Sequence, residues 1–108
     1  MDEQFTIEIT DNDFIAVQFR TDKGNVVRFV ARLVCVIHGK RYDVIRYDTA
    51  HNCPHKDMLD ATGQVRDKIW YSYLNNNQAL TMAIQDIKAN CEAYRERFIT
   101  KWLGPNLQ

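Results

Sequence analysis

Two of the three histidines stand four residues apart in one short polar segment of the chain. The segment reads Arg46-Tyr47-Asp48-Thr49-Ala50-His51-Asn52-Cys53-Pro54-His55-Lys56-Asp57. Imidazole titrates near neutral pH, so one histidine can accept a proton from a reacting group while another donates one. We therefore predict that His51 and His55 serve as general base and general acid in one reaction.

The neighbours of these histidines suit chemistry on a phosphodiester. Asp48 can fix the tautomer of one imidazole, and Arg46 or Lys56 can neutralise a phosphate. RNA supplies its own nucleophile, the 2′-hydroxyl, so the protein need only move protons and stabilise the oxyanion. The segment predicts a metal-independent ribonuclease without a cofactor, with Asp48 as the third catalytic residue and Arg46 and Lys56 as phosphate-binding residues. The alternative is a polar loop whose histidines cap neighbouring carbonyl groups.

The same segment can also be interpreted as a metal site. Alternate positions hold four potential ligands: His51, Cys53, His55 and Asp57. An extended backbone would point all four to one side, although Pro54 would interrupt that alignment. Their spacing matches no zinc knuckle, ribbon or helical zincin pattern. A further alternative makes Cys53 a thiolate nucleophile, because a neighbouring imidazolium lowers the pKa of a thiol.

Composition restricts the class of protein. The chain has 108 residues, 14 Lys plus Arg against 14 Asp plus Glu, and 45% hydrophobic residues. A chain of this length builds one core, so we expect a single domain over residues 1–108. Zero net charge argues against binding to long duplex DNA, which usually requires a basic excess. A local basic patch could still contact a short RNA backbone, and Trp70, Tyr71 and Tyr73 would then either stack on bases or pack internally.

Nothing in the sequence points to a membrane or to export. The apolar run over residues 26–37 is broken by Arg28 and Arg32 and is shorter than the roughly 18 residues that a membrane span needs. The amino end is acidic where a signal peptide is basic. Three cysteines far apart suit reduced thiols rather than disulfides. We expect a cytoplasmic protein.

Strands and one helix must position the polar segment. Apolar and polar residues alternate, with the period of a strand, over six stretches: 5–9, 13–21, 26–38, 41–48, 55–60 and 65–73. Short turns between them, such as His38-Gly39-Lys40, favour antiparallel pairing. We therefore predict an antiparallel β-meander of five or six strands.

The carboxyl-terminal part changes to the period of a helix. Apolar residues recur there at spacings of three and four: Leu80, Ile84, Ile87, Cys91, Tyr94, Phe98 and Trp102. The run Asn75-Asn76-Asn77 offers an N-cap oxygen, and Gly104-Pro105 ends the helix. The predicted fold is α+β, with the meander packed against one long C-terminal helix over residues 78–103. Its apolar stripe should dock on the sheet face that holds Phe29, Leu33 and Ile37.

The polar segment also carries a family resemblance. The pattern Arg46-Tyr47-Asp48-x-Ala50-His51-x-x-x-His55-x-Asp57, followed by Gly63, Lys68 and the C-terminal helix, resembles a family of small bacterial and archaeal proteins of unassigned function. That family in turn is similar to the TumE-type proteins, which are encoded beside helix-turn-helix antitoxins and are regarded as toxins. The resemblance implies a toxin-like component of a toxin–antitoxin or defence system, with a helix-turn-helix antitoxin as partner. This sequence departs from the TumE-type pattern at Thr49, where Asn is usual, and at Asp57, where His is common.

A different class of function stays open. One face of the stretch 26–38 mixes arginines with apolar residues: Arg28, Val30, Arg32, Val34 and Val36. Apolar residues among arginines are typical of interfaces, so we expect something to cover part of this face. The alternative function is a non-catalytic interaction module or a subunit of a homo-oligomer.

Overall fold

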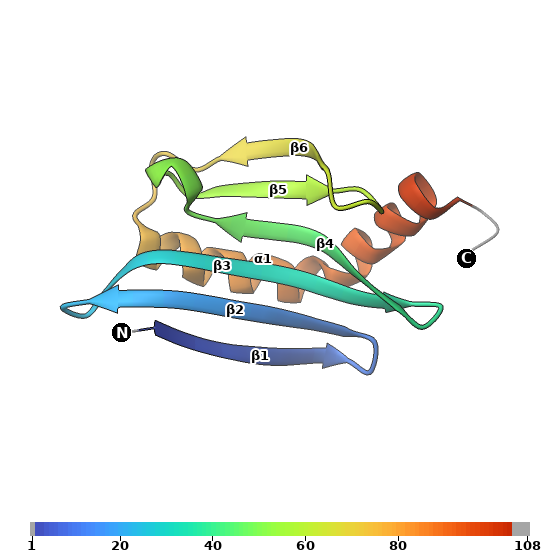
Figure 1. Ribbon diagram of the computed structural model, residues 1–108, viewed down its shortest axis with the longest axis horizontal. Coiled ribbons are helices and arrows are strands. Elements are labelled where there is room, and N and C mark those ends of the chain that lie inside the picture. Colours follow the sequence, from blue (N-terminus) through green and yellow to red (C-terminus); the bar gives the residue numbers. More distant parts are fainter. Residues whose placement is uncertain (1, 105–108) are drawn as a thin grey trace.

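All six predicted strands lie in one antiparallel sheet in the computed structural model, which describes residues 2–104 (Figure 1). They are β1 (Asp2–Thr10), β2 (Asp13–Asp22), β3 (Asn25–Ile37), β4 (Lys40–Asp48), β5 (His55–Leu59) and β6 (Val65–Trp70). Each strand pairs with the next, so the order across the sheet is the order along the chain. The helix α1 (Asn76–Phe98) follows and continues as a π-helical segment (Ile99–Leu103). The predicted α+β meander with one long C-terminal helix is confirmed.

Two tight turns explain why the central strands pair as hairpins. Lys23 and Gly24 connect β2 to β3 with φ angles of 52° and 81°, and His38 and Gly39 connect β3 to β4 with 52° and 77°. Positive φ at both central residues gives a turn whose twist matches that of the flanking strands. Glycine adopts this backbone conformation without the steric cost that a Cβ brings. The two turns therefore fix the register of the three central strands.

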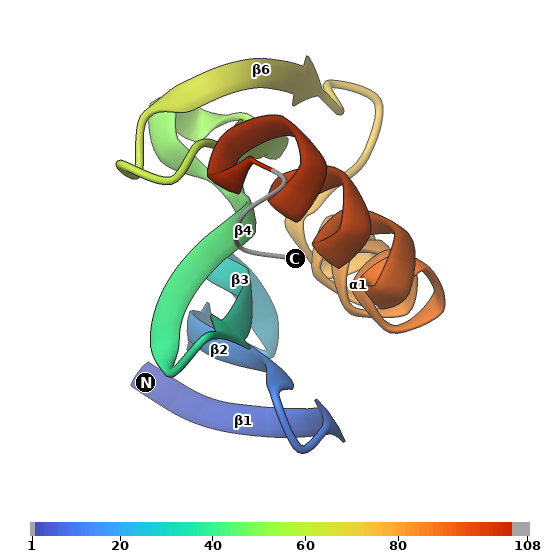
Figure 2. The ribbon, with the colours of Figure 1, turned by 90° about the vertical axis from the view of Figure 1, so that its right-hand side faces the viewer.

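The helix covers only one face of the sheet. Figure 2 shows α1 on one side, where it packs mainly on β3 and β4, while β1 forms the far edge. We call this side the helix face; it carries Leu33, Ile45, Tyr47 and Lys56. The other side, the open face, carries Arg32, Arg46, His55 and Asp57.

The docked stripe of α1 differs slightly from the predicted one. The buried helix residues are Ala79, Ala83, Ile87, Cys91 and Phe98, whereas Leu80, Ile84 and Tyr94 are half-buried. Two alanines occupy the buried positions at the start of the stripe, and the larger Leu80 and Ile84 pack at its margin. The predicted docking surface on the sheet is confirmed, because Phe29, Leu33 and Ile37 are all buried in the core.

The ends of α1 follow local rules. Asn75 accepts a hydrogen bond from the Gln78 amide at 2.8 Å, and the Gln78 side chain accepts one from the Asn75 amide at 3.0 Å. This reciprocal pair satisfies two amide groups that the first turn leaves open. At the other end the helix stops at Gly104, whose φ is 76°. Pro105, the other predicted stop signal, lies outside the described residues.

The cysteines take the positions expected of reduced thiols. Cys35 and Cys91 are buried in the core, and Cys53 is half-buried. Burial raises the pKa of the Cys35 and Cys91 thiols, so both are small apolar groups rather than nucleophiles. Within residues 2–104, no helix combines the length and the apolar character needed to cross a membrane.

Candidate functional site

The polar segment contributes to two parallel rows of side chains that cross the open face. The strand register aligns Thr6, Ala16, Arg32, Arg46, Asp57 and Lys68 in the first row. It aligns Gln4, Gln18, Val30, Asp48, His55 and Trp70 in the second row. Residues two apart on a strand point to the same side, so the two rows lie next to each other. Residues far apart in sequence thus form one cluster over β4, β5 and β6.

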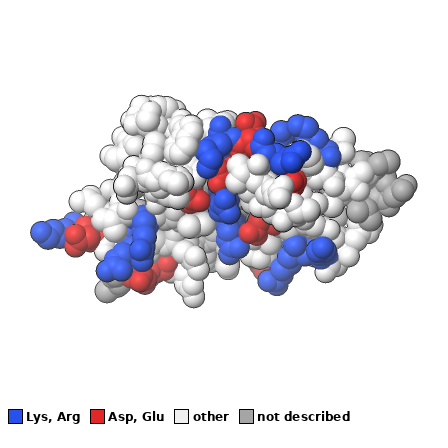
Figure 3. All heavy atoms as spheres, turned by 45° about the horizontal axis from the view of Figure 1, so that its top comes forward, with Lys and Arg blue, Asp and Glu red and all other residues white. Residues whose placement is uncertain are grey.

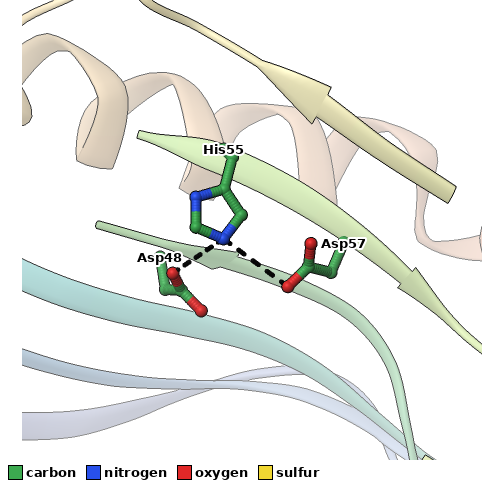
Figure 4. Close-up of side chains that lie close together, drawn as sticks. All are labelled: Asp48, His55 and Asp57. Carbon is green, nitrogen blue, oxygen red and sulfur yellow. Dashed lines mark ion pairs between the residues drawn. The ribbon is translucent and has the colours of Figure 1, made fainter. Parts of the chain in front are cut away.

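His55 is the centre of this cluster. Its Nε2 lies 2.9 Å from Asp48 Oδ1 and 3.6 Å from Asp57 Oδ2 (Figure 4), and its Nδ1 lies 3.0 Å from the Cys53 carbonyl oxygen. The residue is only 1% exposed. Both ring nitrogens face oxygen atoms of the protein, so each is already occupied by a contact within the chain. His55 is therefore held in place by its contacts and offers no nitrogen to a ligand.

Two cations complete the cluster around Asp57. The Lys68 ammonium lies 2.7 Å from Asp57 Oδ1, and the Arg46 guanidinium lies 2.9 Å from Asp57 Oδ2. Arg46 Nε also reaches Asp48 Oδ2 at 3.3 Å. Burial acts to raise the pKa of Asp57, but hydrogen bonds from Lys68 and Arg46 and the charge of His55 outweigh it and hold the pKa below the usual range. Asp57 is thus a buried carboxylate neutralised by cations that still reach solvent.

Charges of both signs mix on this side of the molecule (Figure 3). Arg32 pairs with Asp43 at 3.2 Å, and Arg20 and Arg28 both lie within 4.0 Å of Asp2. Each of these arginines therefore stands near a carboxylate. The charges of these three arginines are therefore partly balanced by neighbouring carboxylates.

His51 lies above the cluster in a strained loop. The 3₁₀ turn Ala50–Asn52 follows β4, and His51 and Asn52 both have positive φ angles, 64° and 58°. Left-handed backbone is uncommon for residues other than glycine, and two in succession must be held by their surroundings. Asp48 Oδ1 does so, because it accepts a hydrogen bond from the Ala50 amide at 2.9 Å. The His51 side chain is exposed, and together with Asp48 it lines a groove of about 990 Å³.

Trp70 joins the loop to the cluster. Its ring centroid lies 6.5 Å from that of His51 and 4.9 Å from that of His55, and the Lys68 ammonium lies 5.2 Å above it. The indole is still 47% exposed. His51 and Trp70 therefore present an imidazole and an aromatic surface to solvent, next to the charges of Lys68 and Arg46.

Lys56 does not belong to this site. It alternates with His55 and Asp57, so its side chain enters the helix face, where Nζ lies 3.2 Å from the Tyr94 hydroxyl and 4.0 Å from Asp86. The sheet separates it from Arg46 and His51, so the predicted phosphate-binding role of Lys56 does not match this geometry. The error has a simple cause: neighbouring residues of a strand point to opposite faces.

The metal ligands predicted from alternate positions are not brought together as a set. The 3₁₀ turn and its left-handed residues end the extended backbone that the prediction required, and Cys53 Sγ points to the Pro54 carbonyl at 3.6 Å. A different trio, Asp48, His55 and Asp57, has potential ligand atoms within 4.8 Å of one another. Arg46 and Lys68 already neutralise these carboxylates, so the donor set does not require a metal ion.

Sequence reasoning located part of the site. It named Arg46, Asp48, His51 and His55, which the structure places in or above the cluster. It named Lys68 only through the family resemblance, and it left Trp70 undecided between stacking and packing. Cross-strand register was the missing information, since Trp70 stands opposite His55 and Lys68 stands opposite Asp57.

Comparison with known families gives a single assignment. The family described as a domain of unknown function, DUF7718, matches residues 1–103, and the chain belongs to this family. No curated protein and no solved structure matches the chain.

Proposed function

We propose that this protein is a toxin-like ribonuclease that binds single-stranded RNA at the exposed end of the open-face cluster and uses His51 for proton transfer, without a metal ion. The observation that carries the proposal is the position of the exposed His51 and Trp70 side by side above a buried network of charges. The proposal includes a helix-turn-helix antitoxin, encoded beside the gene, as the partner that the family resemblance implies.

The exposed groups suit a single strand better than a duplex. An unpaired base can stack on the open surface of Trp70, because every base has an aromatic face. Arg46 and Lys68 are each about one-third exposed, so their charges can reach a neighbouring phosphate while they stay paired with Asp57. A neutral chain can bind a short strand in this way without the net basic charge that duplex binding requires.

His51 is the imidazole that a substrate can reach. As general base it would take the proton of a 2′-hydroxyl, whose oxygen bonds to the adjacent phosphorus while the bond to the 5′-oxygen breaks. The protonated His51 or a water molecule then gives a proton to the departing 5′-oxygen, and the charge of Lys68 or Arg46 would stabilise the oxyanion at phosphorus. His55 takes a positioning role instead of the general-acid role predicted from the spacing. Asp48 connects His55 to the loop of His51. Its Oδ1 contacts both His55 Nε2 and the amide of Ala50, which precedes His51.

Expression in the native host without any partner gene tests the proposal. Wild type should arrest growth and fragment RNA, and His51→Ala should lower the cleavage rate about 10²–10⁴-fold, as expected for loss of a general base. The matched control is His38→Ala, because His38 is also an exposed histidine with positive φ but lies in the turn between β3 and β4. Growth, RNA integrity and melting temperature are measured for all three proteins.

Harmless expression of the wild type with intact RNA would overturn the proposal, and so would full activity of the His51→Ala protein. Either outcome would favour the interaction module. A specific observation supports that second candidate: α1 leaves uncovered the open face of β3, which carries Arg28, Val30, Arg32, Val34 and Val36. Capture of a stable second chain on this face, with RNA intact, is its expected result.

A further inference from the structure

We infer that the groove beside His51 is a base-recognition subsite, which binds one unpaired nucleobase of the RNA and sets the base preference. The inference rests on the proposed function and adds the residues that contact the base of the RNA substrate. The groove lies between the start of β1, the hairpin of β2 and β3, and the loop that carries His51. Its volume of about 990 Å³ is at the upper end of the range typical of small-molecule sites, so a nucleotide fits inside it.

The second row of the open face forms one wall of the groove. In strand order the wall presents Gln4, Gln18, Val30 and Asp48. Val30 is a half-buried apolar residue between polar neighbours, so a flat ring can lie on it while its edge meets the carboxamides. Asp48 is the last residue of the row that lines the groove and lies at the start of the loop of His51, so a base on Val30 would place its sugar and phosphate toward the imidazole.

Carboxamides are suited to reading bases. Each carries both a donor and an acceptor, and base edges present both kinds of group. Gln18 Nε2 lies 3.5 Å from Gln4 Oε1, so the two carboxamides stand side by side at the groove. Within the part of the chain that the structure describes, the Gln18 carbonyl oxygen and the Gln4 amide hydrogens have no other partner. The pair therefore keeps donors and an acceptor for a ligand.

The charges of the groove favour a base over a phosphate in its interior. Asp2, Glu3 and Asp48 all line it and would repel a buried polyanion. Arg28 also lines the groove and lies 3.8 Å from Asp2. A neutral base can thus enter between the carboxylates while its phosphate stays near Arg28 and His51.

Nucleotide binding and RNA cleavage test the subsite separately. The four nucleoside 5′-monophosphates are titrated into the protein, and the side-chain amide NMR signals of Gln4 and Gln18 are followed. Cleavage of the four homopolymeric oligoribonucleotides is then compared for the wild type, Gln18→Leu and Gln4→Leu. The control is Gln85→Leu, an equivalent change at an exposed position of α1.

One nucleotide should bind more tightly than the others and shift both amide signals. Gln18→Leu should reduce the preference between bases about tenfold, the effect expected for loss of one good contact to a base edge, while the Gln85→Leu protein keeps it. An unchanged preference in both Gln4→Leu and Gln18→Leu proteins would overturn the subsite and leave the ribonuclease proposal standing. Nucleotide binding at the two amides without any RNA cleavage would support the subsite and overturn the ribonuclease.

Discussion

Strands β4 and β5 carry two polar clusters on opposite faces, and in each cluster a carboxylate contacts several other polar groups. On the open face, Asp57 contacts Arg46, His55 and Lys68. On the helix face, Asp86 Oδ2 accepts hydrogen bonds at 2.5 Å from the hydroxyls of both Tyr47 and Tyr94. The two clusters share the same pair of strands, yet their cations differ in access to water.

That difference distinguishes an enclosed cluster from one that a ligand can reach. On the helix face, the Lys56 ammonium lies between the rings of Tyr47 and Tyr94, at 5.8 and 5.4 Å from their centroids, and it is covered by α1. This cluster joins the helix to β4 and β5. On the open face, Arg46 and Lys68 remain partly exposed, so the cluster ends at a surface that a ligand can reach. The enclosed helix-face cluster can only stabilise the fold, whereas the exposed cations of the open-face cluster can also bind a ligand.

The largest expected effect comes from removing the helix-face carboxylate. Asp86→Ala leaves a covered ammonium and two tyrosine hydroxyls without their acceptor, so we expect the free energy of unfolding to fall by about 3 kcal/mol. Urea denaturation measures the loss. Glu92→Ala, which removes an exposed carboxylate from the same helix, should change stability by less than about 0.5 kcal/mol. Equal stability of the two variants would show that the Asp86 cluster does not hold the helix.

The corresponding change on the open face should affect stability less. Asp57→Asn removes the charge that Arg46 and Lys68 share, but Arg46 keeps its contact with Asp48 and Lys68 can turn to water, so we expect a loss of about 1–2 kcal/mol. It should also remove most of the RNA cleavage, because the cations lose their fixed positions. Asp67→Asn, at an exposed position of β6, serves as the control. A fully active Asp57→Asn protein would contradict the assignment of the open-face cluster to function.

The comparison also shows what sequence patterns can and cannot predict. Alternation of apolar and polar residues predicted the strands. The same alternation places Lys56 and His55 on different faces of the sheet, because they are neighbours on one strand. The motif interpretation grouped the charged residues of the segment instead, so Lys56 was predicted to bind phosphate although its side chain lies on the helix face. Asp86 was not predicted at all, because its contact with Tyr47 spans 39 residues and depends on how the helix lies on the sheet. The register between strands and the position of the helix on the sheet depend on contacts between distant residues, so the periodicity of a single segment does not predict them.

Acid pH should weaken the helix-face cluster in a defined direction. Burial acts to raise the pKa of Asp86, but hydrogen bonds from Tyr47, Tyr94 and Asn90 and the charge of Lys56 lower it below the usual value. The unfolded chain therefore takes up a proton at this carboxyl at a higher pH than the folded chain does. The stabilisation is complete above the ordinary carboxyl range and is lost as pH falls through the folded pKa.

Urea denaturation from pH 7 to pH 2 measures this dependence. One such carboxylate contributes a slope of at most about 1.4 kcal/mol per pH unit, and Asp86→Asn should remove its share. Glu92→Gln keeps the full slope, since Glu92 is exposed. Parallel curves for the wild type and the Asp86→Asn protein would contradict a lowered pKa at Asp86.

The smallest expected effect is a difference between the lysines of the two clusters in the salt dependence of RNA binding. Lys68→Met removes a cation that can contact RNA phosphate, whereas Lys56→Met removes one that is buried under α1. For a single strand, each phosphate contact contributes about −0.7 to the slope of log K against log salt concentration. We therefore expect the slope for a short oligoribonucleotide to become shallower by about 0.7 in the Lys68→Met protein and to stay unchanged in the Lys56→Met protein. The opposite result would place the phosphate at Lys56, as the sequence motif alone predicted, and would require the helix to move away from the sheet on binding.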